Sequence, residues 1–145
     1  MTPDYSFSGN MTDQGGQRYS VDLHYNENGF KAFGDTASLL PQVFFIGDSY
    51  TACIEVSNEK SFFNMVGDSL GVAIFAYGHA GFGTLQEYMV FDKWVDIIKP
   101  DLVVWEVCSN DFIDNHAPLE MVCGYKVGER RPYLLYSHKI GRAHV

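Results

Sequence analysis

Three residues of this chain have the chemistry needed for acyl transfer, and each follows a run of apolar residues. Ser49 follows the run 43–46, Gly81 follows the run 72–77, and Asn110 follows the run 102–107. A serine hydroxyl can attack an acyl carbonyl, and a glycine N–H and an asparagine amide can stabilise the developing oxyanion. Parallel strands end at one edge of their sheet. If the three runs are such strands, Ser49, Gly81 and Asn110 converge in one site.

The elements that must position these residues can be read from hydrophobic patterning. The three apolar runs predict parallel strands buried on both faces. A helix is predicted over residues 59–70, where Gly71 can take the left-handed conformation at its end. A second helix is predicted to begin at Thr84, with Glu87 completing a capping box, and to stop before Pro100. Alternating strands and helices predict an α/β fold.

The regions outside this pattern are less regular. Residues 1–18 are polar and glycine-rich, which predicts a flexible lead-in. Residues 19–25 alternate between apolar and polar side chains, which predicts a strand, followed by a turn, in an N-terminal extension over 19–42. Residues 43–115 form the predicted core. Beyond them, proline and glycine interrupt the pattern, so 116–145 are predicted to be an irregular tail with one short helix at most.

Composition excludes several classes of protein. The chain has 145 residues, 46% of them hydrophobic, which is enough for one domain with a core. Its formal net charge of −8 argues against a nucleic-acid partner, which would require clustered Lys and Arg. The sequence has no stretch of about 18 apolar residues, so it predicts no membrane span. The three cysteines have no metal-binding spacing, and they predict free thiols rather than a disulfide framework.

The segments around the three residues resemble the conserved blocks of the SGNH/GDSL hydrolases. Residues 45–51, 78–86 and 109–112 resemble the first, second and third block in order. The resemblance implies that Ser49 is the nucleophile and gives one oxyanion donor through its N–H, that the Gly81 N–H is the second donor, and that the Asn110 amide is the third. It also implies an ester substrate, whether small-molecule, carbohydrate or lipid, and no metal or organic cofactor.

The predicted fold is therefore a flavodoxin-like three-layer α/β/α arrangement, with the three strands in the order 2-1-3. Two departures from the family pattern stand out. Cys108 occupies a position that is usually glycine in the third block. The last block, Asp-x-x-His, which supplies the general base and its orienting carboxylate, does not occur. His116 and His138 are poor substitutes by position. We therefore expect the fold to be C-terminally incomplete, and residues 140–145 resemble a translated adapter oligonucleotide.

Two functions from different classes fit these observations. The first is a serine ester hydrolase, or an acyltransferase with the same site, that lacks its histidine in this chain. The alternative is a non-catalytic flavodoxin-like binding module whose loop 47–51 holds a phosphate at a helix N-terminus. No Walker-type lysine follows that loop, which disfavours the alternative. Asp48 is expected to be a loop hydrogen-bonder, and His79 a surface or packing residue.

Overall fold

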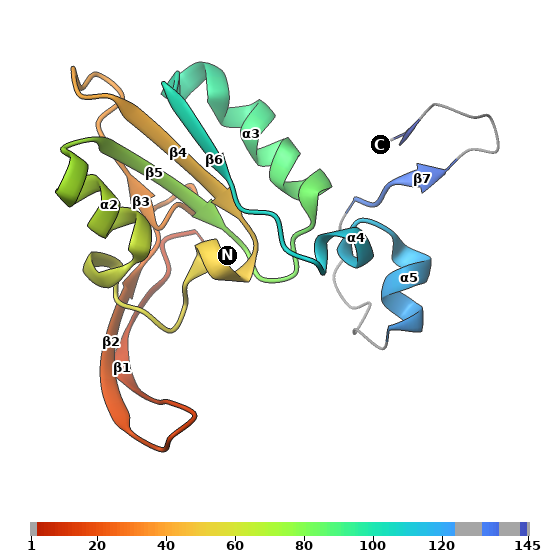
Figure 1. The fold of residues 1–145 in the computed structure, drawn as a ribbon, viewed down its shortest axis with the longest axis horizontal. Coiled ribbons are helices and arrows are strands. Elements are labelled where there is room, and N and C mark those ends of the chain that lie inside the picture. Colours follow the sequence, from red (N-terminus) through yellow and green to blue (C-terminus); the bar gives the residue numbers. More distant parts are fainter. Residues whose placement is uncertain (1–2, 124–131, 137–142, 145) are drawn as a thin grey trace.

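The central element is a four-stranded, mostly parallel sheet. The computed structural model describes residues 3–123, 132–136 and 143–144. The sheet contains β3 (Ala32–Phe33), β4 (Gln42–Gly47), β5 (Ala73–Gly78) and β6 (Leu102–Trp105), in the order β3-β5-β4-β6 (Figure 1). The last three strands are parallel, whereas β3 pairs antiparallel with β5. The three predicted apolar runs therefore form three neighbouring parallel strands.

Helices cover both faces of this sheet. On one face α2 (Phe62–Leu70) contributes Phe63 to a cluster with Phe45 of β4 and Ile74 of β5. On the other face α3 (Thr84–Ile98) contributes Trp94 and Ile98 to a second cluster. Figure 1 shows the two helices on either side of the strands. Alternate residues of β4 thus enter different clusters, which explains why its sequence is an unbroken apolar run.

The two long helices begin and end according to different local rules. Gly71 ends α2 with a φ of 64°, as the sequence predicted. The capping box predicted from Thr84 and Glu87 is wrong. The N-cap of α3 is Gly83, and the Gln86 side chain accepts a hydrogen bond from its N–H at 2.8 Å. Glu87 is instead turned inward and fully buried.

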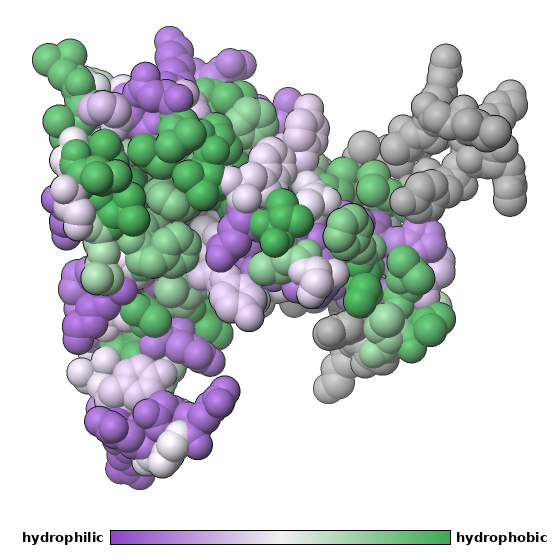
Figure 2. All heavy atoms as spheres, in the orientation of Figure 1, coloured by the Kyte–Doolittle hydropathy of each residue, from purple (hydrophilic) through white to green (hydrophobic). Residues whose placement is uncertain are grey.

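The N-terminal residues form a β-hairpin, contrary to the flexible lead-in predicted for residues 1–18. Strand β1 (Ser6–Thr12) pairs antiparallel with β2 (Arg18–His24). One face of the hairpin is apolar, because alternate residues of both strands point to the same side and form a small cluster; its members are Phe7, Met11, Tyr19, Val21, Leu23 and Tyr25. The hairpin extends away from the central sheet in Figure 1. Its outer end is hydrophilic in Figure 2, whereas hydrophobic side chains gather over α2.

Short elements make up the remaining described structure. They are α1 (Ser49–Ala52), the 3-10 helix η1 (Asn58–Lys60), α4 (Asp111–Asp114), α5 (Ala117–Val122), β7 (Leu135–Tyr136) and β8 (Ala143–His144). The tail predicted as irregular thus contains the short helix α5 and a two-residue strand pair. Strand β6 stops two residues before its predicted end. In the part of the chain that the structure describes, β6 pairs only with β4 and is an edge strand.

Candidate functional site

Ser49 is the first residue of α1, directly beyond the carboxyl end of β4. Asp48 caps this helix, because its Oδ1 accepts a hydrogen bond from the Tyr50 N–H at 3.0 Å, which fulfils the predicted role of a loop hydrogen-bonder. Asp48 is fully buried, whereas Ser49 is exposed. The N–H of a first helical residue has no partner within its helix. Ser49 therefore presents both its hydroxyl and its N–H at the edge of the sheet.

The loop that carries Gly81 packs against α1 through Gly78. A Cβ at Gly78 would lie 2.2 Å from the Ala52 nitrogen and 2.7 Å from the Asp48 carbonyl oxygen, so only glycine fits there. Gly81 follows three residues later with a φ of 81°, a conformation that favours glycine. The steric contact at Gly78 places the start of this loop directly against the helix that begins with Ser49.

Asn110 joins the third loop to the first. Its Nδ2 donates hydrogen bonds to Asp48 Oδ2 at 3.1 Å and to Asp114 Oδ2 at 2.9 Å. An asparagine amide has two N–H groups, and both are directed at carboxylates here. The third oxyanion donor predicted from the sequence would therefore act only after one of these two hydrogen bonds opens. The contact nevertheless brings the Asn110 loop next to the residue that precedes Ser49.

Further acidic side chains lie near these loops, and sequence reasoning did not identify them as part of the site. Glu87 of α3 accepts a hydrogen bond from the Trp105 Nε1–H at 2.6 Å, while its Oε1 is buried with no partner among the described residues. Asp111 accepts from the Cys108 N–H at 2.9 Å. The Thr51 hydroxyl donates to Glu106. The sequence did hold a signal for the burial of Glu87, because Glu87 lies among the apolar residues of the α3 stripe. Its interpretation as part of a capping box led away from that signal.

Burial changes the ionisation of this acidic group. Desolvation is the main cause that raises the pKa of Glu87 to about 7, and the neighbouring charges of Asp111, Asp48 and Glu106 act in the same direction. Burial also raises the pKa of Asp111, and it raises that of the Cys108 thiol to about 11. The Glu87 carboxyl therefore keeps its proton well above the pH at which an exposed glutamate ionises.

Two histidines of the described structure, His24 and His79, are engaged elsewhere. His24 Nδ1 lies 3.0 Å from the Ser6 hydroxyl on the hairpin. His79 Nδ1 lies 2.9 Å from the Ala80 carbonyl oxygen, and its ring stacks on Phe82 at 4.6 Å. No imidazole hydrogen-bonds the Ser49 hydroxyl within residues 3–123. His138 and the side chain of His144 lie outside the described residues.

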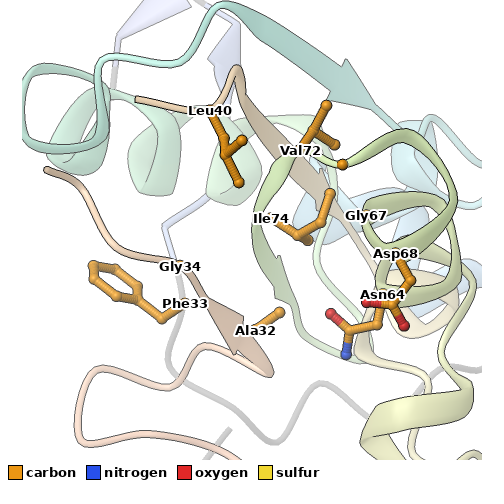
Figure 3. Close-up of a pocket in the computed structure, with 10 residues that line it drawn as sticks. Ala32, Phe33, Gly34, Leu40, Asn64, Gly67, Asp68, Val72 and Ile74 are labelled. Carbon is orange, nitrogen blue, oxygen red and sulfur yellow. The ribbon is translucent and has the colours of Figure 1, made fainter. Parts of the chain in front are cut away.

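One pocket adjoins Ser49, and a second pocket lies apart from it. A pocket of about 430 Å³ is lined by Ser49 and by the residues after it, including Tyr50, Cys53 and Ile54. A larger pocket of about 580 Å³ lies between β3 and α2 (Figure 3). Its walls carry the polar side chains of Asn64 and Asp68, and they do not include Ser49. The smaller pocket is the one that an acyl group on Ser49 would meet.

In the described part of the chain, no group of three or more His, Cys, Asp and Glu side chains is arranged to hold a metal ion. No described helix has both the length and the apolarity needed to cross a membrane. Comparison with protein-family models, curated proteins and solved structures found no match.

Proposed function

We propose that this chain carries the nucleophile and oxyanion donors of a serine ester hydrolase, with Ser49 as the nucleophile. The observation that carries the proposal is the hydrogen bond from Asn110 Nδ2 to Asp48 Oδ2, which joins two of the three loops that resemble the family blocks. The fit of Gly78 against Ala52 supports the same convergence for the remaining loop. An exposed serine where three such loops meet is suited to attack a bound ester.

In the proposed reaction the Ser49 oxygen attacks the acyl carbonyl carbon and a tetrahedral intermediate forms. The N–H groups of Ser49 and Gly81 donate hydrogen bonds to its oxyanion, and the Asn110 amide joins them by exchanging one carboxylate for the oxyanion. Collapse breaks the bond to the alcohol oxygen and leaves an acyl-serine. Water then releases the carboxylic acid, or an acceptor hydroxyl takes the acyl group in a transferase. A base must take the Ser49 proton, and no described residue is placed to do so.

We further propose that the fold is flavodoxin-like with three layers. The parallel order β5-β4-β6 and the clusters on both sheet faces support this assignment. A ligand in such folds binds beyond the carboxyl ends of the strands, which is where Ser49 lies. The proposed substrate is an ester of a small molecule, a carbohydrate or a lipid.

The phosphate-binding alternative is less well supported by the charges at the site. The helix after β4 has four residues, and its N-cap is the carboxylate of Asp48. Asp114 and Asp111 are buried near Asp48. Asn110 bridges Asp114 to Asp48, and the charge of Asp48 acts on Asp111. A phosphate dianion would face these acids, whereas an oxyanion is a transient single charge that needs only two or three N–H donors.

Labelling with a fluorophosphonate tests the proposal. We expect the probe to modify Ser49, and the Ser49→Ala variant to remain unlabelled. Ser109 is a matched control, because it is also exposed and lies beside Asn110. The Ser109→Ala variant should be labelled like the wild-type chain. Added imidazole should accelerate the labelling of Ser49, because no described imidazole contacts its hydroxyl. Equal labelling of wild-type and Ser49→Ala chains, or none with imidazole present, would refute the proposed nucleophile.

A further inference from the structure

The helix that begins with Ser49 is too short to hold itself in place. It has four residues, and a single helical turn is unstable in isolation because nucleation costs more than one hydrogen bond returns. Its last carbonyl groups also have no partners within the helix. The position of the Ser49 N–H therefore depends on contacts from other parts of the chain.

Two buried side chains supply these contacts. The Tyr25 hydroxyl donates a hydrogen bond to the Ala52 carbonyl oxygen at 2.7 Å, and Tyr25 is fully buried. The Lys31 ammonium donates to the Cys53 carbonyl oxygen and, at 2.7 Å, to that of Val56. Lys31 is only 3% exposed, which is unusual for a lysine without a carboxylate bonded to it. Both side chains come from the segment between β2 and β3.

The residues after α1 are also tied to the hairpin. The Asn58 side chain donates to the Lys31 carbonyl oxygen at 2.8 Å and to that of His24 at 2.7 Å, and it accepts from the His24 N–H at 3.0 Å. The Ser57 hydroxyl accepts from the Asp22 N–H at 3.0 Å. The backbone from residue 52 to residue 58 is thus held by the N-terminal segment at both of its ends.

The backbone at Cys53 links these hydrogen bonds to the position of Ser49. Cys53 has a φ of 53°, which is uncommon for a residue with a Cβ and persists only where surrounding contacts impose it. Its N–H donates to the Ser49 carbonyl oxygen at 3.0 Å, which closes the turn. Movement of the Cys53 peptide would therefore be transmitted to Ser49.

From this arrangement we infer that Tyr25 and Lys31 are positioning residues for the nucleophile. Together they form a clamp, by which we mean the hydrogen bonds from these two side chains to residues 52, 53 and 56. The inference rests on the proposed function of Ser49. It assigns to the N-terminal hairpin region a role in the site, because the clamp residues follow β2 directly and their neighbours are bonded to it.

The charge on Lys31 gives the clamp a pH signature. Burial is the main cause that lowers the pKa of this amine to about 8, while the nearby Cys53 thiol and Glu59 carboxylate act in the opposite direction. Tyr25 is the other titratable donor of the clamp, and burial raises its pKa, so it stays protonated. Above pH 8 the amine becomes neutral, and its hydrogen bonds to the two carbonyl groups lose their ionic contribution.

The test compares Tyr25→Phe and Lys31→Met with the wild-type chain. Lys60→Met is the matched control, since Lys60 is exposed on η1. The first readout is hydrogen exchange at the Ala52 and Cys53 amides, whose hydrogen bonds close α1. The second is the rate of fluorophosphonate labelling of Ser49 between pH 6 and 9 in the presence of imidazole.

Each clamp variant should speed exchange of these two amides. Tyr25→Phe, which loses one hydrogen bond, should slow Ser49 labelling by about tenfold, and Lys31→Met, which loses two, by at least as much. Exchange in β4 and β5 should stay unchanged, which shows that the variant is folded, and Lys60→Met should match the wild type. The labelling advantage of wild type over Lys31→Met should shrink above pH 8. Labelled wild type with equally labelled clamp variants would overturn the inference and leave the function standing. An unlabelled wild type would overturn the proposed function, and the inference with it.

Discussion

Glu87 should make the stability of this protein fall as the pH rises through the acid and neutral range. The side chain is fully buried on α3, and one of its oxygens has no described hydrogen-bond partner. Burial raises its pKa from 4.5 to about 7. Below pH 4.5 the carboxyl is protonated in both states. Between pH 4.5 and 7 the unfolded chain ionises first, so it binds fewer protons than the folded chain and stability decreases.

The size of this effect follows from the shift in pKa. Each unit is worth about 1.4 kcal/mol, so ionisation of Glu87 should remove on the order of 3 kcal/mol of unfolding free energy by pH 7. The Glu87→Gln variant cannot ionise, and its amide oxygen can still accept from the Trp105 N–H. We expect the variant to match the wild type near pH 4.5 and to be more stable by roughly 2 to 3 kcal/mol at pH 8.

The measurement is urea unfolding at several pH values from 4.5 to 8. Asp92→Asn is a suitable control, because Asp92 lies on the same helix but is exposed. This variant should keep the pH dependence of the wild type. Part of the wild-type slope should survive in Glu87→Gln as well, because burial also raises the pKa of Asp111. A Glu87→Gln slope equal to that of the wild type, or a less stable variant at pH 8, would refute the reasoning.

Four further outcomes are expected. Asn110→Ala should destabilise the fold by about 2 to 3 kcal/mol in urea unfolding, because two buried carboxylates lose their shared donor; an unchanged midpoint would contradict the bridging role. Gly78→Ala should abolish cooperative thermal unfolding or lower its midpoint strongly, since the Cβ would meet the main chain of α1 at 2.2 Å; normal unfolding would mean that this loop packs differently. Unfolding free energy should rise between pH 8 and 9 in the wild type, where the unfolded lysine stays protonated while folded Lys31 does not, and this rise should be absent in Lys31→Met. The chain should hydrolyse a short acyl ester slowly or not at all, whereas turnover lost both in Ser49→Ala and in one histidine variant would reveal a base at the site.

Local sequence signals determined the elements of the core. Apolar runs predicted β4, β5 and β6. Burial on both faces is confirmed for β4 and for most of β5, because such strands have no room for polar side chains. It is wrong for β6, whose first residue is exposed and whose other three are only partly buried. Helix α2 was predictable because its stripe and the glycine that ends it are properties of a few neighbouring residues. The exposed position of Ser49 after the first strand also follows from sequence, since serine after an apolar run begins a loop or a helix.

Tertiary structure decided what the local signals left ambiguous. The pattern of residues 6–12 is weak, and it became a strand because the apolar face of β2 offered it a partner. Glu87 satisfied a local rule for helix capping, but its carboxylate is buried against Trp105 and Gln86 makes the capping hydrogen bond.

The clamp is the clearest feature that depends on tertiary structure and could not be predicted from local sequence. Nothing in the sequence near Lys31 indicates a buried ammonium, because its acceptors are carbonyl groups more than twenty positions later in the chain. Every residue has a backbone carbonyl, so the sequence does not indicate which carbonyl groups will accept these hydrogen bonds. Sequence alone therefore predicted the candidate site residues, whereas the fold determined which side chains bond to the backbone around them.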